Sequence, residues 1–324
     1  MKKSNYLDFT PSKETPFMRD IFMETLFQEA KKDKNILLLT PDMGAPTLDK
    51  FRKELPKQFI HNGISEQHMI DFACGLAMSG KKVFCYAMAP FITSRTFDQL
   101  KCAVAAMNVP ITLVGIGVGL GYADAGPTHY TTEDLACMRS LSNIEILTPC
   151  DNISAKANLI NCIENPKFRF IRLDRENLND VYETFDLHED EIHKEILHGE
   201  KIAIISCGFL IHNSIKIINE IKKNNSSINI GLIDLYKIKP ILKNTALKNT
   251  IKKYDKILSL EEQTLYGGFG SAILEYLNHH GLHKDLIRFG LDDIYYFENG
   301  GRDHLLEKYG LSSSKIKDTI INLI

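Results

Sequence analysis

The chain has 324 residues, of which 44% are hydrophobic and 25% charged, and its formal net charge is -2. This length suits two domains, and the composition is that of an ordinary globular protein. The near-neutral charge gives no reason to expect a nucleic-acid or acidic-membrane partner, and no apolar run is long enough to span a bilayer.

Apolar runs alternate with amphipathic stretches along the first half of the chain, which is typical of a parallel α/β sheet. In chain order, the pattern predicts helices over 18–31, 66–79, 97–107 and 132–140, with strands over 36–39, 83–87, 111–114, 145–147 and 168–173. Residues 176–200 are acidic and lack buried-type runs, which indicates a connection between domains. Their histidines, His188, His193 and His198, are five residues apart and are expected to be solvated.

A second α/β pattern follows this connection. It predicts strands over 202–206, 228–235 and 257–260, a helix over 210–222, and a glycine-led helix from Gly267 to Leu277. We therefore expect two three-layer α/β/α domains with mostly parallel sheets. The predicted bounds are 1–180 for the first domain, 181–200 for a linker and 201–324 for the second domain.

The cysteines and the first residues indicate in which cellular compartment the protein is expected. The seven cysteines are scattered, odd in number and nowhere spaced as Cys-x-x-Cys. This pattern argues against a disulfide framework or a zinc site and favours a reducing, cytoplasmic setting. The stretch from Met1 to Tyr6 has no apolar core behind its charges, so we expect no secretory signal there.

The most informative stretch is Asn62-Gly63-Ile64-Ser65-Glu66-Gln67-His68-Met69, which enters a predicted helix at Ser65. The helix dipole favours a carboxylate in the first turn, and by spacing alone Glu66 is best interpreted as a capping residue. Two apolar turns follow, however, so this helix enters a core, where desolvation disfavours the charged form of a carboxylate. Glu66 is therefore also a candidate for handling a proton.

Six collinear motifs resemble those of the transketolase family and of deoxyxylulose-phosphate synthase. They are the segment around Glu66, Thr40-Pro41-Asp42-Met43-Gly44, the aromatic segment 91–99, Gly126-Pro127-Thr128-His129 with Glu133-Asp134-Leu135, the segments 148–151 and 172–175, and Glu261-Glu262-Gln263 with Gly267 to Ser271. One such motif would be weak evidence, whereas six in the same order are strong evidence. The resemblance implies a pyrimidine-binding domain followed by a transketolase C-terminal domain.

The resemblance also implies a cofactor, thiamine diphosphate, and roles for residues around it. Glu66 would hydrogen-bond a ring nitrogen of the aminopyrimidine and so activate the cofactor. Phe91 would stack on the aminopyrimidine ring, and Asp42 would lie near the thiazolium side. Phe97 would either line this pocket or pack in the core, and the two alternatives are nearly equal.

Substrate contacts are implied in the same way. His129 would contact sugar hydroxyls and the developing oxyanion, Arg175 would hold the acceptor's phosphate, and Arg19 is either a second phosphate ligand or a surface ion pair. The family usually reads Gly-(Glu/Ala)-Asp-Gly-Pro-Thr-His-Gln. Here one extra residue displaces Asp124 from the position that contacts the donor's hydroxyl, and Tyr130 replaces the glutamine. We therefore expect altered sugar specificity, for example toward an amino, deoxy or nucleotide-linked sugar in a biosynthetic pathway.

The diphosphate-binding half of such enzymes has no counterpart in this sequence, because no Gly-Asp-Gly motif occurs. The resemblance implies that a partner chain, the N-terminal half of a transketolase, carries this motif and binds Mg2+ with the diphosphate. We expect this chain to supply no metal ligand and to form a heterotetramer, of the alpha2beta2 type, with the cofactor at the interface.

Three alternatives remain open at this level. A subunit like deoxyxylulose-phosphate synthase, which decarboxylates pyruvate, is favoured by His68 and by Gly268 to Ser271, although that enzyme is normally a single chain. The beta subunit of 2-oxoacid dehydrogenases would show a Gly-Pro-x-Gly loop and a Ser-Gln segment that are not found. A non-catalytic regulatory homologue is disfavoured because Glu66, Phe91 and His129 are all retained.

Overall fold

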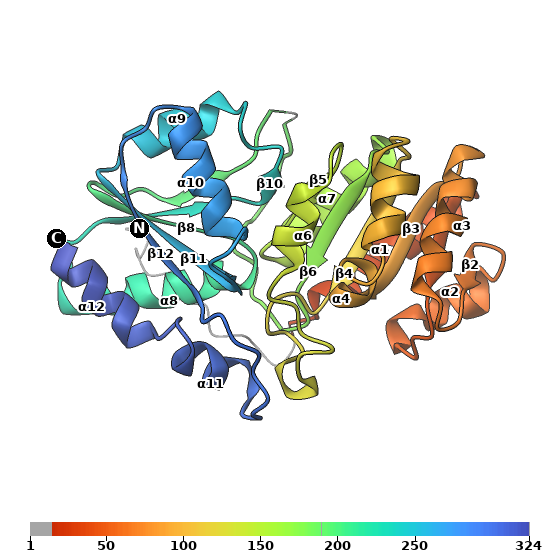
Figure 1. Cartoon of the computed structure of the whole chain (residues 1–324), viewed down its shortest axis with the longest axis horizontal. Helices are drawn as coiled ribbons and strands as arrows, with labels where there is room; N and C mark the ends of the chain where they lie inside the picture. Colours follow the sequence, from red (N-terminus) through yellow and green to blue (C-terminus); the bar gives the residue numbers. More distant parts are fainter. Residues whose placement is uncertain (1–14, 189, 324) are drawn as a thin grey trace.

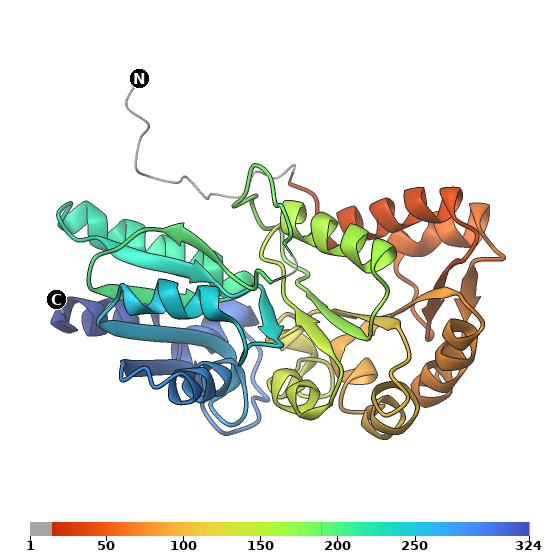
Figure 2. The same cartoon turned by 90° about the horizontal axis from the view of Figure 1, so that it is seen from above.

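The computed structural model describes residues 15–188 and 190–323, so the stretch from Met1 to Tyr6 lies outside the described residues. In the described ranges the chain forms two lobes, each built from a sheet with helices on its faces (Figure 1, Figure 2). Both sheets are mostly parallel, which confirms the predicted α/β class. No helix in this described part of the chain is both long and apolar enough to cross a membrane.

The first lobe contains, within the described residues, a seven-stranded sheet with the order β10-β5-β6-β4-β3-β1-β2. Its strands are β1 Ile36–Thr40, β2 Phe59–His61, β3 Lys82–Met88, β4 Ile111–Ile116, β5 Glu145–Leu147, β6 Arg169–Leu173 and β10 Lys237–Lys239. All neighbours pair in parallel except β10, which is antiparallel to β5. The central strands β1, β4 and β6 are buried at every position, as expected for a parallel sheet covered on both faces.

Helices cover both faces of this sheet. They are α1 Met18–Lys32, α2 Asp49–Glu54, α3 Glu66–Met78, α4 Ala89–Ile92, α5 Phe97–Gln99, α6 Asp134–Ser140 and α7 Asn152–Glu164, with short helical segments at Pro46–Leu48, Leu100–Ala105 and Ala123–Ala125. Figure 2 shows α1 and α7 on one face of the sheet and α3 and α6 on the other. The predictions did not include α7, although Asp151 and Ser154 form a capping box at its start.

The second lobe contains, over the residues that the structure describes, a five-stranded sheet with the order β12-β11-β8-β9-β7. Its strands are β7 Lys194–Leu197, β8 Ile202–Ser206, β9 Ile230–Asp234, β11 Lys256–Thr264 and β12 Asp285–Leu291, and its helices are α8 Phe209–Asn224, α9 Thr245–Lys252, α10 Phe269–His279, α11 Gly301–Lys308 and α12 Ser313–Leu323. Strand β7 is antiparallel to β9, and the other strands pair in parallel.

The connection between the lobes is more ordered than its sequence suggests. Residues 181–200, expected to be a linker, include β7, which is an edge strand of the second sheet. The prediction that His193 is solvated is wrong: its side chain is buried and its Nε2 lies 2.8 Å from Thr250 Oγ1. Burial lowers the pKa of His193, so this imidazole favours its neutral form.

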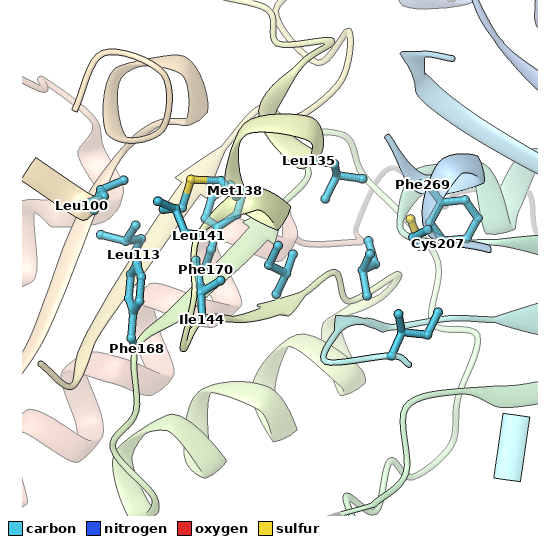
Figure 3. Close-up of a cluster of buried hydrophobic side chains, with 14 of the residues drawn as sticks. Leu100, Leu113, Leu135, Met138, Leu141, Ile144, Phe168, Phe170, Cys207 and Phe269 are labelled. Carbon is cyan, nitrogen blue, oxygen red and sulfur yellow. The ribbon is translucent and has the colours of Figure 1, made fainter. Parts of the chain in front are cut away.

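The two lobes share one hydrophobic core. Figure 3 shows Leu113 and Phe170 of the first sheet, Leu135 and Met138 on α6, and then Phe269 of the second lobe. The edge strand β10 adds a backbone connection, because it comes from the second half of the chain and pairs with β5 of the first sheet. Continuous packing of this kind favours a fixed orientation of the lobes.

A buried carboxyl at the junction of the lobes predicts a pH-dependent stability. Asp234 is fully buried. Tyr182 donates a hydrogen bond to its Oδ2 at 2.8 Å, and the Cys150 thiol lies 3.4 Å from the same oxygen. The other carboxyl oxygen, Oδ1, has no hydrogen-bond partner among the described residues. Burial raises the pKa of Asp234 from 3.8 to about 7. Between these values the folded state binds more protons than the unfolded state, so stability falls as the pH rises.

Asp234→Asn should therefore flatten the pH dependence of stability in this window, because an amide needs no proton to remain neutral. Urea unfolding at about pH 5 and about pH 7 measures the slope in each protein. An unchanged slope in the variant would show that Asp234 does not carry the effect.

Candidate active site

The predicted site residues gather at one edge of the first sheet, beyond the carboxyl ends of its parallel strands. Asp42 follows β1, Glu66 follows β2, Phe91 follows β3, His129 lies in the loop after β4, and Arg175 follows β6. Because these strands run in the same direction, their following loops converge on this edge, where open α/β sheets bind ligands. The topology thus places residues from five segments in one region.

Glu66 begins α3 and is only 4% exposed. The turn that leads into it uses Gly63 at φ 68, a left-handed conformation that favours glycine, and the Ser65 hydroxyl donates to the Asn62 carbonyl at 2.6 Å. The carboxylate does not act as a simple cap: its Oε1 accepts a hydrogen bond from Arg95 Nη1 at 2.9 Å. A buried carboxylate in a first helical turn is thus aimed at a neighbouring segment.

Phe91 lies next to this ion pair. The guanidinium carbon of Arg95 is 4.1 Å from the centroid of the Phe91 ring, and the His129 ring meets Phe91 edge-on at a centroid distance of 5.4 Å. Glu66, Arg95, Phe91 and His129 therefore form a continuous chain of contacts. Phe91 and Phe97 are both half-buried and both pack against the core shared by the lobes.

The loop that carries His129 is fixed to the second lobe. His129 Nδ1 lies 2.8 Å from Thr128 Oγ1, and the following residue, Tyr130, is fully buried. The backbone N–H of Tyr296 donates to the Tyr130 hydroxyl at 2.7 Å. The tyrosine that departs from the family pattern therefore ties this loop to the second lobe.

Asp124, in the same loop, is exposed and also contacts the second lobe. Its Oδ1 accepts hydrogen bonds from the backbone N–H groups of Gly301 at 3.0 Å and Gly300 at 3.4 Å, at the start of α11. Figure 1 shows the yellow loop after β4 beside α11. The carboxylate is thus engaged with a helix terminus, and its contact with a substrate stays a prediction.

The two predicted phosphate ligands, Arg175 and Arg19, have different neighbours. The Arg175 guanidinium carbon is 4.5 Å from the centroid of the Tyr122 ring, and Arg175 is exposed. Arg19, in the first turn of α1, pairs with Asp20 at 3.0 Å. Burial raises the pKa of Tyr122, whereas the positive charges of Arg175 and Arg19 act to lower that pKa.

Asp42 lies at the periphery of this group. Its side chain is 62% exposed, and its Oδ1 is 3.4 Å from His61 Nε2. In the described ranges, no group of three or more His, Cys, Asp or Glu side chains could hold a metal ion.

Two elements of the site were missed by sequence reasoning. Arg95 follows Phe91 by one helical turn, a spacing that could have suggested their contact. Arg302, on α11, is buried between Asp174 and Glu262, with Nη2 2.8 Å from Asp174 Oδ2 and Nε 2.7 Å from Glu262 Oε1. Asp174 directly precedes Arg175, so this network holds the end of β6 against the second lobe.

Comparison with known proteins gives the family. The model described as "Transketolase, pyrimidine binding domain" matches residues 14–181, and that described as "Transketolase, C-terminal domain" matches residues 193–316. A transketolase C-terminal section of Methanocaldococcus jannaschii is 30% identical over 311 residues, which are 94% of this chain and 95% of the relative. One of the subunits of the apulose-4-phosphate transketolase of Phocaeicola vulgatus is 28% identical over 309 residues, 94% of this chain and 97% of the relative.

A longer relative and two solved structures are also similar to this chain. The 1-deoxy-D-xylulose-5-phosphate synthase of Shouchella clausii is 33% identical over 95% of this chain, which spans about half (49%) of that protein. A split-gene transketolase, solved as an inactive beta4 tetramer, has the same fold with a TM-score of 0.81 at 23% identity, covering 94% of this chain and 97% of its own. The transketolase of Campylobacter jejuni has a TM-score of 0.78 at 19% identity, covering 98% of this chain and 48% of its own. The chain therefore belongs to the transketolase family and carries its pyrimidine-binding and C-terminal domains.

Proposed function

We propose that this chain is the cofactor-activating subunit of a two-subunit, thiamine-diphosphate-dependent enzyme that transfers a two-carbon ketol unit between sugars or sugar phosphates. The observation that carries the proposal is the buried residue Glu66, 4% exposed, whose carboxylate bonds Arg95 while the Arg95 guanidinium lies over the Phe91 ring. Relatives of nearly the same length named as a transketolase section and a transketolase subunit support it.

The residues present suit an aminopyrimidine ring. Such a ring needs a carboxyl group at a ring nitrogen and a flat apolar surface, and Glu66 and Phe91 offer these on the two sides of the Arg95 guanidinium. Stacking of aromatic rings contributes about 0.5–1.5 kcal/mol beyond the burial of their area. Thiamine diphosphate, when bound, supplies the carbanion chemistry, and Glu66 would hold and return a proton at the ring nitrogen.

The substrate would lie between Phe91 and Tyr122. His129 contacts the Phe91 ring, so we assign it to the sugar hydroxyls and to the oxygen that gains charge during the reaction. Arg175 lies over the Tyr122 ring, and we assign Arg175 and Arg19 to a substrate phosphate, whose geometry suits guanidinium groups. Phe97 and Asp42 would line the outer parts of the cofactor site.

A partner chain completes the proposed site. We assign the diphosphate and Mg2+ to an N-terminal-half transketolase subunit with a Gly-Asp-Gly motif, and we propose that two copies of each chain assemble in the cytoplasm. The naming of the Phocaeicola vulgatus relative as a subunit and the split gene of the solved structure support this division.

We also propose that the substrates differ from those of an ordinary transketolase. Tyr130 stands where the family has a glutamine, and Tyr130 and Asp124 both tie the loop that bears His129 to the second lobe. We take these contacts of Tyr130 and Asp124 as support for a changed substrate. The relative that acts on apulose 4-phosphate, by its name, is an example of such a substrate change.

Assays of the chain reconstituted with its partner test this function. Ketol transfer from a sugar donor is expected, without release of carbon dioxide from pyruvate. Release of carbon dioxide would instead favour the second candidate, a deoxyxylulose-phosphate-synthase-like activity, which the 33% identity to that enzyme makes the main alternative. Full activity with xylulose 5-phosphate and ribose 5-phosphate would refute the proposed change of substrate but not the proposed ketol transfer.

A further inference from the structure

Arg95 makes the two contacts that the proposed cofactor would need. Its Nη1 donates to Glu66 Oε1 at 2.9 Å, and its guanidinium carbon lies 4.1 Å from the centroid of the Phe91 ring. The side chain thus lies over the aromatic face and against the buried carboxylate at the same time. An aminopyrimidine that stacked on Phe91 and bonded Glu66 would need this space.

The chemistry of the two groups is similar. A guanidinium is planar, delocalised and rich in N–H donors, and it stacks on aromatic faces while it bonds a carboxylate. A protonated aminopyrimidine is likewise flat, cationic and an N–H donor. We propose that Arg95 is a reversible plug, meaning that its side chain fills the aminopyrimidine position between Glu66 and Phe91 and leaves when the cofactor binds. This inference rests on the function proposed above.

The local structure allows the side chain to move while the backbone stays in place. The Arg95 N–H donates to the Pro90 carbonyl at 3.2 Å, and the Thr93 hydroxyl donates to the Ala89 carbonyl at 2.7 Å. The Arg95 side chain is 40% exposed, whereas that of Glu66 is 6% exposed. The Arg95 side chain can therefore reach solvent from its present backbone position, whereas the Glu66 side chain cannot.

The plug has a physical reason. A buried carboxylate without a partner is unfavourable, so Arg95 satisfies Glu66 until a cofactor replaces it. Because the plug competes with the cofactor, the apparent affinity equals the intrinsic affinity multiplied by the fraction of molecules in which the plug is open. A site in which the plug is closed nine times in ten would bind about tenfold more weakly than an open one.

The test measures binding by the full-length chain, with calorimetry and the free hydroxymethyl-aminopyrimidine half of thiamine as the probe. Arg95→Ala should bind this probe at least about tenfold more tightly than the wild type, because the plug is gone. The gain should disappear in the double variant Glu66→Gln with Arg95→Ala. Arg52→Ala is a matched control, because Arg52 also combines an ion pair with a ring contact: its Nη1 lies 2.7 Å from Asp49 Oδ1, and its guanidinium carbon lies 5.4 Å from the centroid of the Phe59 ring. The affinity of Arg52→Ala for the probe should equal that of the wild type.

Equal or weaker binding by Arg95→Ala, or no measurable binding by it, would overturn the plug. If Arg95→Ala does not fold, as judged by circular dichroism, Arg95→Lys replaces it. This variant keeps the charge but loses the planar group that stacks on Phe91. An affinity of Arg95→Lys for the probe equal to that of the wild type would overturn the proposal. A failed plug leaves the proposed function standing as long as Glu66→Gln still impairs the assembled enzyme. Unimpaired Glu66→Gln would instead refute the function.

Discussion

Glu66→Gln is expected to lower the turnover of the assembled enzyme by about a hundredfold to ten-thousandfold, the range that general acid–base catalysis contributes. Glutamine keeps the shape of the side chain and can still bond Arg95 or a ring nitrogen, but it cannot take up or return a proton. The side chain is buried in the first turn of α3, so solvent cannot substitute for it easily. Steady-state assays with saturating cofactor measure the effect on turnover.

A surface glutamate provides the control for this prediction. Glu24 pairs with Lys50 on the surface, and Glu24→Gln should leave turnover unchanged. A normal rate in Glu66→Gln would contradict the assignment and would favour the alternative of a non-catalytic homologue. A low rate in both variants would point to a general loss of structure.

Arg302→Met is expected to destabilise the fold by about 3–5 kcal/mol, the cost of removing one partner from a buried ion pair. Arg302 bonds Asp174 at 2.8 and 3.0 Å and Glu262 at 2.7 Å, and its guanidinium carbon is 3.5 Å from the centroid of the Phe209 ring. Methionine fills part of the space but leaves two buried carboxylates without a cation. Urea unfolding measures the loss.

The loss of stability in Arg302→Met should depend on pH, and its direction can be derived. Burial raises the pKa of Glu262, and the charge of Arg302 opposes that rise. Without the cation the pKa rises further, so the folded state binds protons more tightly than the unfolded state, and the loss of stability shrinks as the pH falls. Lys308→Ala is the control and should not change stability, because it removes only an exposed pair between Lys308, at the end of the helix α11 that carries Arg302, and Glu298, which precedes that helix. A penalty in Arg302→Met that is independent of pH would contradict this electrostatic explanation.

The parts that the sequence predicts are those with strong local signals. The continuous apolar runs of β1, β4 and β6 indicate buried parallel strands, and the segment around Glu66 carries a motif in chain order with five others. Because parallel strands bring their carboxyl ends together, the convergence of Glu66, Phe91 and His129 follows from the fold class.

The parts that the sequence does not predict depend on contacts between distant residues. The three-residue strand β10 is held by its pairing with β5. Strand β7, which pairs with β9, lies in an acidic stretch without a run of buried-type residues. The local sequence therefore predicts neither strand. Arg95 and Glu66 are 29 residues apart, and Arg302 is 128 residues from Asp174. Ion pairs over such separations are decided by the packing of elements that are distant in sequence, which no local pattern describes.

We propose that Glu66 activates a cofactor that a partner chain largely holds. The most direct measurement is the rate at which the hydrogen on the reactive thiazolium carbon of thiamine diphosphate exchanges with deuterated solvent, followed by nuclear magnetic resonance after rapid quenching. We predict that this chain with its partner accelerates the exchange over free cofactor, and that Glu66→Gln loses at least about a hundredfold of that acceleration. Equal exchange rates in the wild type and in Glu66→Gln would contradict the claim.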